Sequence, residues 1–225
     1  MAEPIVPLVT GRLLRRYNRF LADVTLDSGE LVTAHVPNTG SMRSTREPGS
    51  RVALSFHPSP HRKLHWTLEM VESENCWVGV NTSTTNAMVE ASVRAGLIAP
   101  LQGYPDIRRE VKTSPESRID LLLSNGDSRC FVEVKNVTWK EGTQALFPDA
   151  VTVRGTRHLR ELQRLQQEGA RSVIFFLVNR GDCDTMGPAH QLDPVYAQTL
   201  ADVMEGGVEA LAWRFARSLD GWQPD

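Results

Sequence analysis

Several features that would define a class of protein are scarce or missing in this chain of 225 residues. The three cysteines, Cys76, Cys130 and Cys183, are odd in number and far apart, so we expect reduced thiols. The longest strictly apolar run, 173–178, is far shorter than the roughly 20 residues that a membrane helix requires. The first residues also lack the basic start and long apolar stretch of a secretion signal. We therefore expect a cytoplasmic protein with no membrane association.

The chain also has little net charge, because 25 basic and 27 acidic residues leave −2 at neutral pH. The charge is unevenly distributed: residues 10–66 hold nine Lys and Arg residues against four acidic ones, a local charge of +5. A locally basic segment on a nearly neutral protein indicates a polyanionic partner. No nucleotide-binding loop or cofactor motif is visible in the sequence.

The first 80 residues have the pattern of short strands separated by turns, with no helix. Apolar residues alternate with polar ones in 20–26, 31–36, 52–56, 66–70 and 77–80. Short strands at this spacing predict a small barrel. An OB barrel and an SH3-like barrel both fit, and the OB type is the first choice because it commonly binds nucleic acid.

The pattern changes near Asn81, where helix signals begin. The predicted helices are 87–95, 155–168 and 193–205, and the predicted strands are 107–112, 118–124, 130–137, 172–178 and 208–215. This order predicts a mixed α/β sheet, with 172–178 buried on both faces. We expect two domains, a barrel over 1–82 and an α/β domain over 83–225.

Three residues of the second domain form the most informative motif. Asp120 starts one apolar run, and Glu133 and Lys135 lie inside the next, beyond an Asn125-Gly126 turn that favours a hairpin. Side chains two apart on a strand share a face, so the hairpin can bring all three together. Two carboxylates with a lysine suit a hard cation and an activated water, as in a metal-dependent phosphodiesterase. A surface ion pair between Glu133 and Lys135 is the alternative.

Two further acids are candidates for the same site. Glu90 lies in the first predicted helix and could reach the sheet from its side, and Glu110 lies on the strand before Asp120. The alternative interpretation of each residue is a solvent-exposed acid with no role in the site. Because there is no cluster of cysteine and histidine, Mg²⁺ or Mn²⁺ fits better than zinc.

Arginines near the N-terminus, together with a turn and a helix start, are candidate phosphate contacts. Arg12, Arg15, Arg16 and Arg19 either bind phosphate or keep a strand edge soluble, and segment 38–43 is either a phosphate loop or a connecting turn. Arg154 and His158 share one face of a helix start, where His158 assists proton transfer or simply forms a hydrogen bond.

The chain resembles the bacterial sugar fermentation stimulation protein A family over nearly its whole length. The matching segments are 15–24, 37–40, 117–120, 132–138 and 147–152, followed by Arg154-Gly155 and 158–162. The resemblance implies an OB-like domain joined to a domain like the PD-(D/E)xK nucleases. It also implies DNA binding and a role in regulating maltose metabolism genes.

The resemblance also assigns roles to residues. Asp120, Glu133 and Lys135 take the catalytic positions, Asp120, Glu133 and Glu90 the metal positions, and Ser117-Arg118-Ile119 replaces the usual proline segment before Asp120. The expected nucleic-acid contacts are Arg15, Arg16, Arg19, Arg43, Arg118, Arg154 and His158.

Two functions remain open at this stage. The first is a DNA-binding protein with a divalent-metal nuclease site, and the second is a DNA-binding regulator that keeps the nuclease fold as a scaffold. Neither a helix-turn-helix nor a zinc finger is visible, so we expect binding to be largely independent of sequence and steeply dependent on salt. The sequence does not distinguish DNA from RNA, or a monomer from a homodimer.

Overall fold

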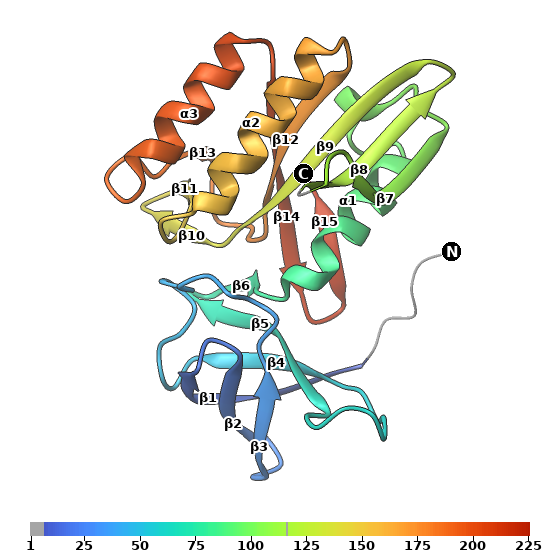
Figure 1. Ribbon diagram of the computed structural model, residues 1–225. Helices are drawn as coiled ribbons and strands as arrows, with labels where there is room; N and C mark the ends of the chain where they lie inside the picture. Colours follow the sequence, from blue (N-terminus) through green and yellow to red (C-terminus); the bar gives the residue numbers. More distant parts are fainter. Residues whose placement is uncertain (1–6, 116) are drawn as a thin grey trace.

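The computed structural model describes residues 7–115 and 117–225, and it places a small barrel below a larger α/β domain (Figure 1). The barrel strands are β1 (Leu8–Tyr17), β2 (Leu21–Leu26), β3 (Leu31–His35), β4 (Arg51–Phe56) and β5 (Trp66–Ser73). β1 pairs with both β2 and β4, and a parallel pairing of β3 with β5 closes the barrel. The predicted OB barrel is confirmed.

Alternation of apolar and polar residues explains the barrel. Ala22, Val24 and Leu26 on β2 point inward and are buried, while the residues between them are partly exposed. β1 is an additional strand that the sequence reasoning did not predict, because Arg12, Arg15 and Arg16 interrupt its apolar pattern. β6 (Cys76–Gly79) then pairs with β5 and leads the chain to the second domain.

The second domain is built around one six-stranded mixed sheet. Its strands follow the order β15-β14-β12-β9-β8-β7, and β12 runs parallel to both β9 and β14. The elements are η1 (Thr82–Thr84), α1 (Thr85–Arg94), η2 (Ala99–Leu101), β7 (Asp106–Lys112), β8 (Arg118–Asn125), β9 (Ser128–Val137), β10 (Trp139–Glu141), β11 (Gln144–Phe147), α2 (Val153–Gln167), β12 (Arg171–Val178), β13 (Thr185–Pro188), α3 (Pro194–Glu205), β14 (Glu209–Ser218) and β15 (Gly221–Pro224). The predicted helices and strands are all present in the predicted order. The short strands β10, β11, β13 and β15 are additional.

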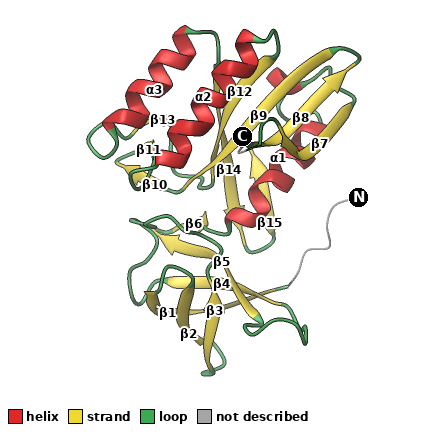
Figure 2. Ribbon diagram, in the orientation of Figure 1, coloured by secondary structure: helices red, strands yellow, loops and turns green. Residues whose placement is uncertain are grey.

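Helices cover both faces of this sheet. α2 and α3 lie side by side on one face, where Leu159, Leu162 and Tyr196 pack against Phe176 (Figure 2). α1 packs on the opposite face. β12 is therefore buried from both sides, as its continuous apolar run predicted.

The β8–β9 hairpin carries the predicted acidic residues. Asn125 pairs with Ser128, so the two turn residues are Gly126 and Asp127, one position later than predicted. Gly126 has a φ of +57°, which glycine adopts without steric cost. The last described pair at the other end is Leu121 with Val132, just before Asp120.

Hydrogen bonds donated by backbone N–H groups join the two domains. The Gly79 N–H donates to the Asn179 carbonyl at 2.8 Å, and the Met42 N–H donates to Asp149 Oδ2 at 2.8 Å. The predicted domain boundary between residues 82 and 83 falls inside η1, the short helix that precedes α1. None of the described helices is both long enough and apolar enough to cross a membrane.

Candidate metal and phosphodiesterase site

Glu133 lies at the centre of the candidate site, on β9, with only 1% of its surface exposed. The alternation of β9 places Lys135 on the same face as Glu133, and Lys135 Nζ donates to Glu133 Oε1 at 2.6 Å. His158 reaches the same oxygen from α2 through a short hydrogen bond from its Nδ1. A buried carboxylate is thus held by two nitrogen donors on one oxygen.

Asp120 joins this cluster from β8, where pairing with β9 stops. Its Oδ2 accepts from the Val134 N–H at 2.8 Å, so the carboxylate occupies the position of the missing strand pair. Its Oδ1 accepts from Asn86 Nδ2 on α1 at 2.9 Å. The structure therefore brings Asp120, Glu133 and Lys135 together.

The two carboxylates have opposite pKa shifts. Burial raises the pKa of Asp120 to about 6, the charge of Glu133 adds to this, and the Val134 N–H and Lys135 only partly oppose it. Burial also raises the pKa of Glu133, but Lys135 and His158 outweigh burial and leave it below the usual value. Glu133 is therefore ionised at neutral pH, and its repulsion of Asp120 is a cost that a bound cation would relieve.

The second oxygen of Glu133 tests whether the site fits a metal. Oε2 is buried and has no hydrogen-bond partner among the described residues. An unsatisfied buried acceptor is costly, and a carboxylate oxygen is the ligand that hard cations prefer. The residues therefore fit a divalent cation. In the described part of the chain, no three or more His, Cys, Asp or Glu residues are grouped so that they could hold a metal ion.

α1 presents Asn86 to Asp120, and Glu90 lies one turn further along. The Glu90 carboxylate pairs with Arg94 at 2.8 Å and with Arg109 at 3.0 Å, and the structure does not bring it to Asp120 or Glu133. Sequence reasoning missed Asn86. Its spacing of four residues before Glu90, which puts both on one helix face, was the only available signal.

Glu110 lies beside this arrangement. Its Oε1 accepts from the same Asn86 Nδ2 at 3.1 Å, so Asn86 links Glu110 to Asp120. Glu110 has a φ of +54°, which is uncommon for a residue other than glycine. Its side chain is 54% exposed, so Glu110 borders the site rather than lying within it.

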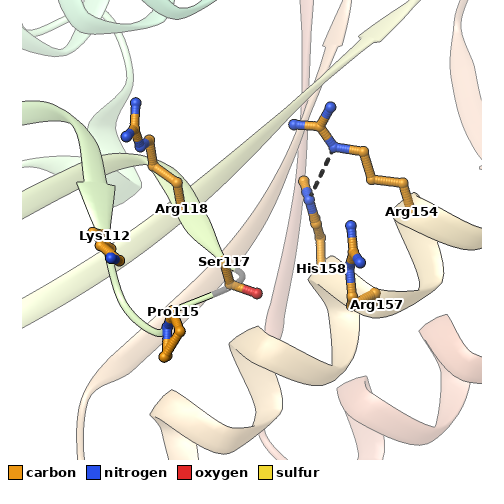
Figure 3. A pocket seen from close by; sticks show the side chains of 7 residues that line it. All are labelled: Lys112, Pro115, Ser117, Arg118, Arg154, Arg157 and His158. Atoms are coloured by element: carbon orange, nitrogen blue, oxygen red, sulfur yellow. Dashed lines mark hydrogen bonds between the residues drawn. The ribbon is translucent and has the colours of Figure 1, made fainter.

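Arg154 and His158 interact on α2 as their spacing predicted. Arg154 Nε donates to His158 Nε2 at 3.3 Å (Figure 3). This hydrogen bond makes Nε2 an acceptor, so Nδ1 carries the proton that is donated to Glu133. Arg118, from the start of β8, lies 3.9 Å from Glu110.

The arginines of the barrel are placed differently from one another. Arg15 is exposed, pairs with Asp23 at 2.8 Å and lies over the Tyr17 ring. Arg16 is half-buried and donates to the carbonyls of Asn38 at 2.9 Å and Gly40 at 3.0 Å. These hydrogen bonds hold loop 38–41 against β1. Arg19 is exposed, and its carbonyl also accepts from Arg16.

Segment 38–43 has the hydrogen bonds of a connecting turn. The Gly40 N–H donates to Asn38 Oδ1, and the Met42 N–H donates to Asp149, so these groups are already occupied. Arg43 donates to the Asp149 carbonyl at 3.3 Å and lies over the Trp139 ring. This contact orders the loop against the segment that precedes α2.

Fold and site together define a class of protein: an OB barrel joined to a mixed α/β domain that carries two carboxylates and a lysine on adjacent strands. Two family models match the chain, the SfsA N-terminal OB domain over residues 14–80 and the sugar fermentation stimulation protein RE domain over 83–221. The chain belongs to the sugar fermentation stimulation protein (SfsA) family.

Relatives and a solved structure agree with this assignment. The chain is 53% identical to a sugar fermentation stimulation protein homolog of Pelobacter propionicus, over 92% of this chain and 90% of the relative. It is 51% identical to a homolog of Paramagnetospirillum magneticum, over 96% and 92%. The structure of Pyrococcus furiosus SfsA in complex with Ca²⁺ is also similar, with a TM-score of 0.88 and 30% identity, covering 96% of this chain and 92% of that one.

Proposed function

We propose that this chain is a DNA-binding protein whose second domain cleaves phosphodiester bonds with the help of a divalent cation. The observation that carries the proposal is the meeting of Asp120 and Glu133 on adjacent strands, with Lys135 Nζ at 2.6 Å from Glu133 Oε1. Glu133 Oε2 has no hydrogen-bond partner among the described residues. Metal-assisted hydrolysis uses this set of groups: a carboxylate pair with a free oxygen to bind the cation, and a neighbouring ammonium group.

Asp120 and Glu133 would hold the cation, with Mg²⁺ or Mn²⁺ as the expected ion. When bound, the cation supplies Lewis-acid polarisation of a phosphate oxygen and lowers the pKa of a bound water. The P. furiosus relative supports a hard cation, because Ca²⁺ takes the same class of oxygen ligand as Mg²⁺. Glu90 is the remaining candidate ligand. It would have to leave Arg94 and Arg109 to reach the site.

The other residues position these groups. Lys135 would orient or deprotonate the attacking water, or stabilise the charge that develops on the phosphate. His158 holds Glu133 Oε1 and thereby leaves Oε2 available. Asn86 and the Val134 N–H fix both oxygens of Asp120. Catalysis by proximity and orientation requires reacting groups whose positions are fixed in this way.

DNA is the expected substrate. The OB barrel is a fold that commonly binds nucleic acid, and exposed arginines occur on both domains. Neither a helix-turn-helix nor a zinc site occurs among the described residues, so phosphate contacts should dominate and affinity should fall steeply with salt.

Cleavage of supercoiled plasmid with Mg²⁺ or Mn²⁺ tests the proposal. We expect the wild type to nick or linearise the plasmid, and both Glu133→Gln and Lys135→Met to lose at least about 100-fold in rate, as general acid–base groups contribute 10²–10⁴-fold. Glu205→Gln removes an exposed acid at the end of α3 and is the matched control. Cleavage that survives in Glu133→Gln would assign the activity to another site.

A non-enzymatic DNA-binding regulator of sugar metabolism is the second candidate. One observation favours it: Lys135 and His158 both engage Glu133 Oε1, so Glu133 is already compensated without a cation. This function predicts salt-sensitive DNA binding that is equal in the wild type and Glu133→Gln, with no cleavage by either protein.

A further inference from the structure

Next to the carboxylates, α2 and the β7–β8 connection enclose a pocket that the catalytic proposal does not use. Its volume is about 340 Å³, at the lower end of small-molecule sites. The lining residues, here called the basic pocket, are Lys112, Pro115, Ser117, Arg118, Arg154, Arg157 and His158 (Figure 3). Four of these seven residues are cations at neutral pH, and none of the described lining residues is an acid; Glu116, between Pro115 and Ser117 in the sequence, lies outside the described residues.

The cations come from two opposite walls. Lys112 and Arg118 belong to the β7–β8 side, and Arg154 and Arg157 belong to the first turns of α2 (Figure 3). Like charges gathered around one space repel each other, so the arrangement favours an anion between them. The N-terminus of α2 adds the positive end of its dipole on the same side.

Most of this charge is not compensated by acidic side chains among the described residues. Within residues 7–115 and 117–225, neither Lys112 nor Arg157 takes part in a side-chain hydrogen bond or ion pair. The one ion pair of Arg118 with a described residue is the loose contact of 3.9 Å with Glu110, and both of these side chains are more than half exposed. In the described part of the chain, the one side-chain hydrogen bond of Arg154 goes to His158.

An adjoining hollow on the same helix is partly neutralised by acidic side chains. It shares Pro115, Ser117 and Arg157 with the basic pocket and continues to Arg160 and Arg164. There, Glu161 pairs with Arg164 at 2.8 Å, and Glu168 contacts Arg164 as well. The charge of Arg164 is therefore compensated within the protein, and we expect the basic pocket to bind an anion more strongly than this extension.

His158 connects the basic pocket to the candidate cleavage site. The same side chain lines the pocket, contacts Glu133 through Nδ1 and lies 3.2 Å from Lys135 Nζ. A phosphate group in the pocket would therefore lie one residue away from the carboxylates. In a nucleic-acid strand, phosphates follow one another along the backbone, so one can occupy the pocket while its neighbour lies at Glu133.

We propose that the basic pocket binds a phosphate group of the DNA strand next to the bond that is cut, with Lys112, Arg118, Arg154 and Arg157 as ligands. This inference rests on the proposed function, and it assigns the strand contact to the α2 side of the second domain. Arg157 and Lys112 are the new assignments. Each should contribute to affinity at every DNA sequence, because a phosphate carries no sequence information.

The test is binding of a fluorescent DNA duplex to the full chain in EDTA, measured over a range of salt concentrations. Each phosphate contact contributes about −0.9 to the slope of log affinity against log salt. We expect Arg157→Ala and Lys112→Ala each to make the slope shallower by about 0.9, and Arg157→Lys to retain it. Arg129→Ala, at the exposed hairpin end of β9, is the charge-matched control and should retain the wild-type slope.

The duplex is used with either a 5′-hydroxyl or a 5′-phosphate end. Equal slope changes on both duplexes support an internal phosphodiester in the pocket, and a change confined to the phosphorylated duplex supports a terminal phosphate. Slopes unchanged in Arg157→Ala and Lys112→Ala on both duplexes overturn the inference. Because EDTA prevents cleavage, this result is separate from the plasmid assay. If the protein does not cleave plasmid but shows the slope change, the phosphate-binding pocket is supported and the nuclease function is rejected.

Discussion

Asp120 is the residue whose pKa shift most directly supports a bound cation at this site. Its pKa of about 6 lies above the 3.8 of an unperturbed aspartate, so the folded state binds a proton more tightly than the unfolded state. The stability of the metal-free protein should therefore fall as pH rises from about 4 to about 6, and then stay level.

Removing the charge of Asp120 should abolish this loss. Without metal, the free energy of unfolding of the wild type should fall by on the order of 2–3 kcal/mol between pH 4 and pH 8. This fall should be absent in Asp120→Asn, whose amide keeps only one of the two acceptor oxygens. Asp127→Asn, in the exposed β8–β9 turn, should change little. Equal unfolding of the wild type and Asp120→Asn at both pH 4 and pH 8 would contradict the account.

Arg16 differs from its neighbour Arg15 although both belong to the same basic run. Arg16 donates to backbone carbonyls of the 38–41 loop and is half-buried, so Arg16→Ala should lower stability by about 2 kcal/mol. Arg15→Ala should change stability little, because exposed ion pairs contribute little. Urea denaturation of both variants checks this. Equal unfolding midpoints for Arg16→Ala and Arg15→Ala would show that Arg16 does not stabilise the loop.

The N-terminus of α2 is the element on which both proposals depend, since it carries Arg154, Arg157 and His158. Thr152 caps it by accepting from the Gly155 N–H at 3.0 Å. We expect Thr152→Ala to cost about 1 kcal/mol and to weaken DNA binding, and Thr152→Ser to retain both. Unfolding and anisotropy measurements on the two variants decide this. If a destabilised Thr152→Ala protein binds DNA as well as the wild type, the helix cap is not needed for phosphate binding in the basic pocket.

Local pattern explains which elements and site residues could be predicted. Glu133 and Lys135 were predictable because the period of two acts within one strand, and Asp120 because a two-residue hairpin is also local. Asn86 was not predictable, since its contact with Asp120 depends on how α1 packs on the sheet. Strands of three or four residues, such as β10 and β13, are too short to show a period.

The role of Arg16 was hidden for a related reason. A run of arginines in sequence suggests phosphate contacts, but the carbonyls that Arg16 binds belong to a loop more than 20 residues away. Charge alone does not tell a solvated arginine from one that fills backbone acceptors. Only tertiary structure separates the two cases.

At the domain junction, β6 ties the barrel to the α/β sheet. The Gly79 N–H donates to Asn179, and a Cβ at Gly79 would lie 2.2 Å from Asn179 Oδ1. We expect Gly79→Ala to cost roughly 1–3 kcal/mol through this overlap and to lower the midpoint of the whole protein. Calorimetry should show one transition in the wild type. An unchanged midpoint in Gly79→Ala would mean that the contact does not hold the domains together.

The central claim is that Asp120 and Glu133 form a divalent-cation site, and calorimetric titration of Mn²⁺ into the metal-free protein tests it most directly. This measurement needs no DNA substrate. The account predicts saturable binding by the wild type at pH 7 that is lost in Glu133→Gln and retained in Glu205→Gln. Absence of saturable binding in the wild type, or equal binding in Glu133→Gln, would contradict the account.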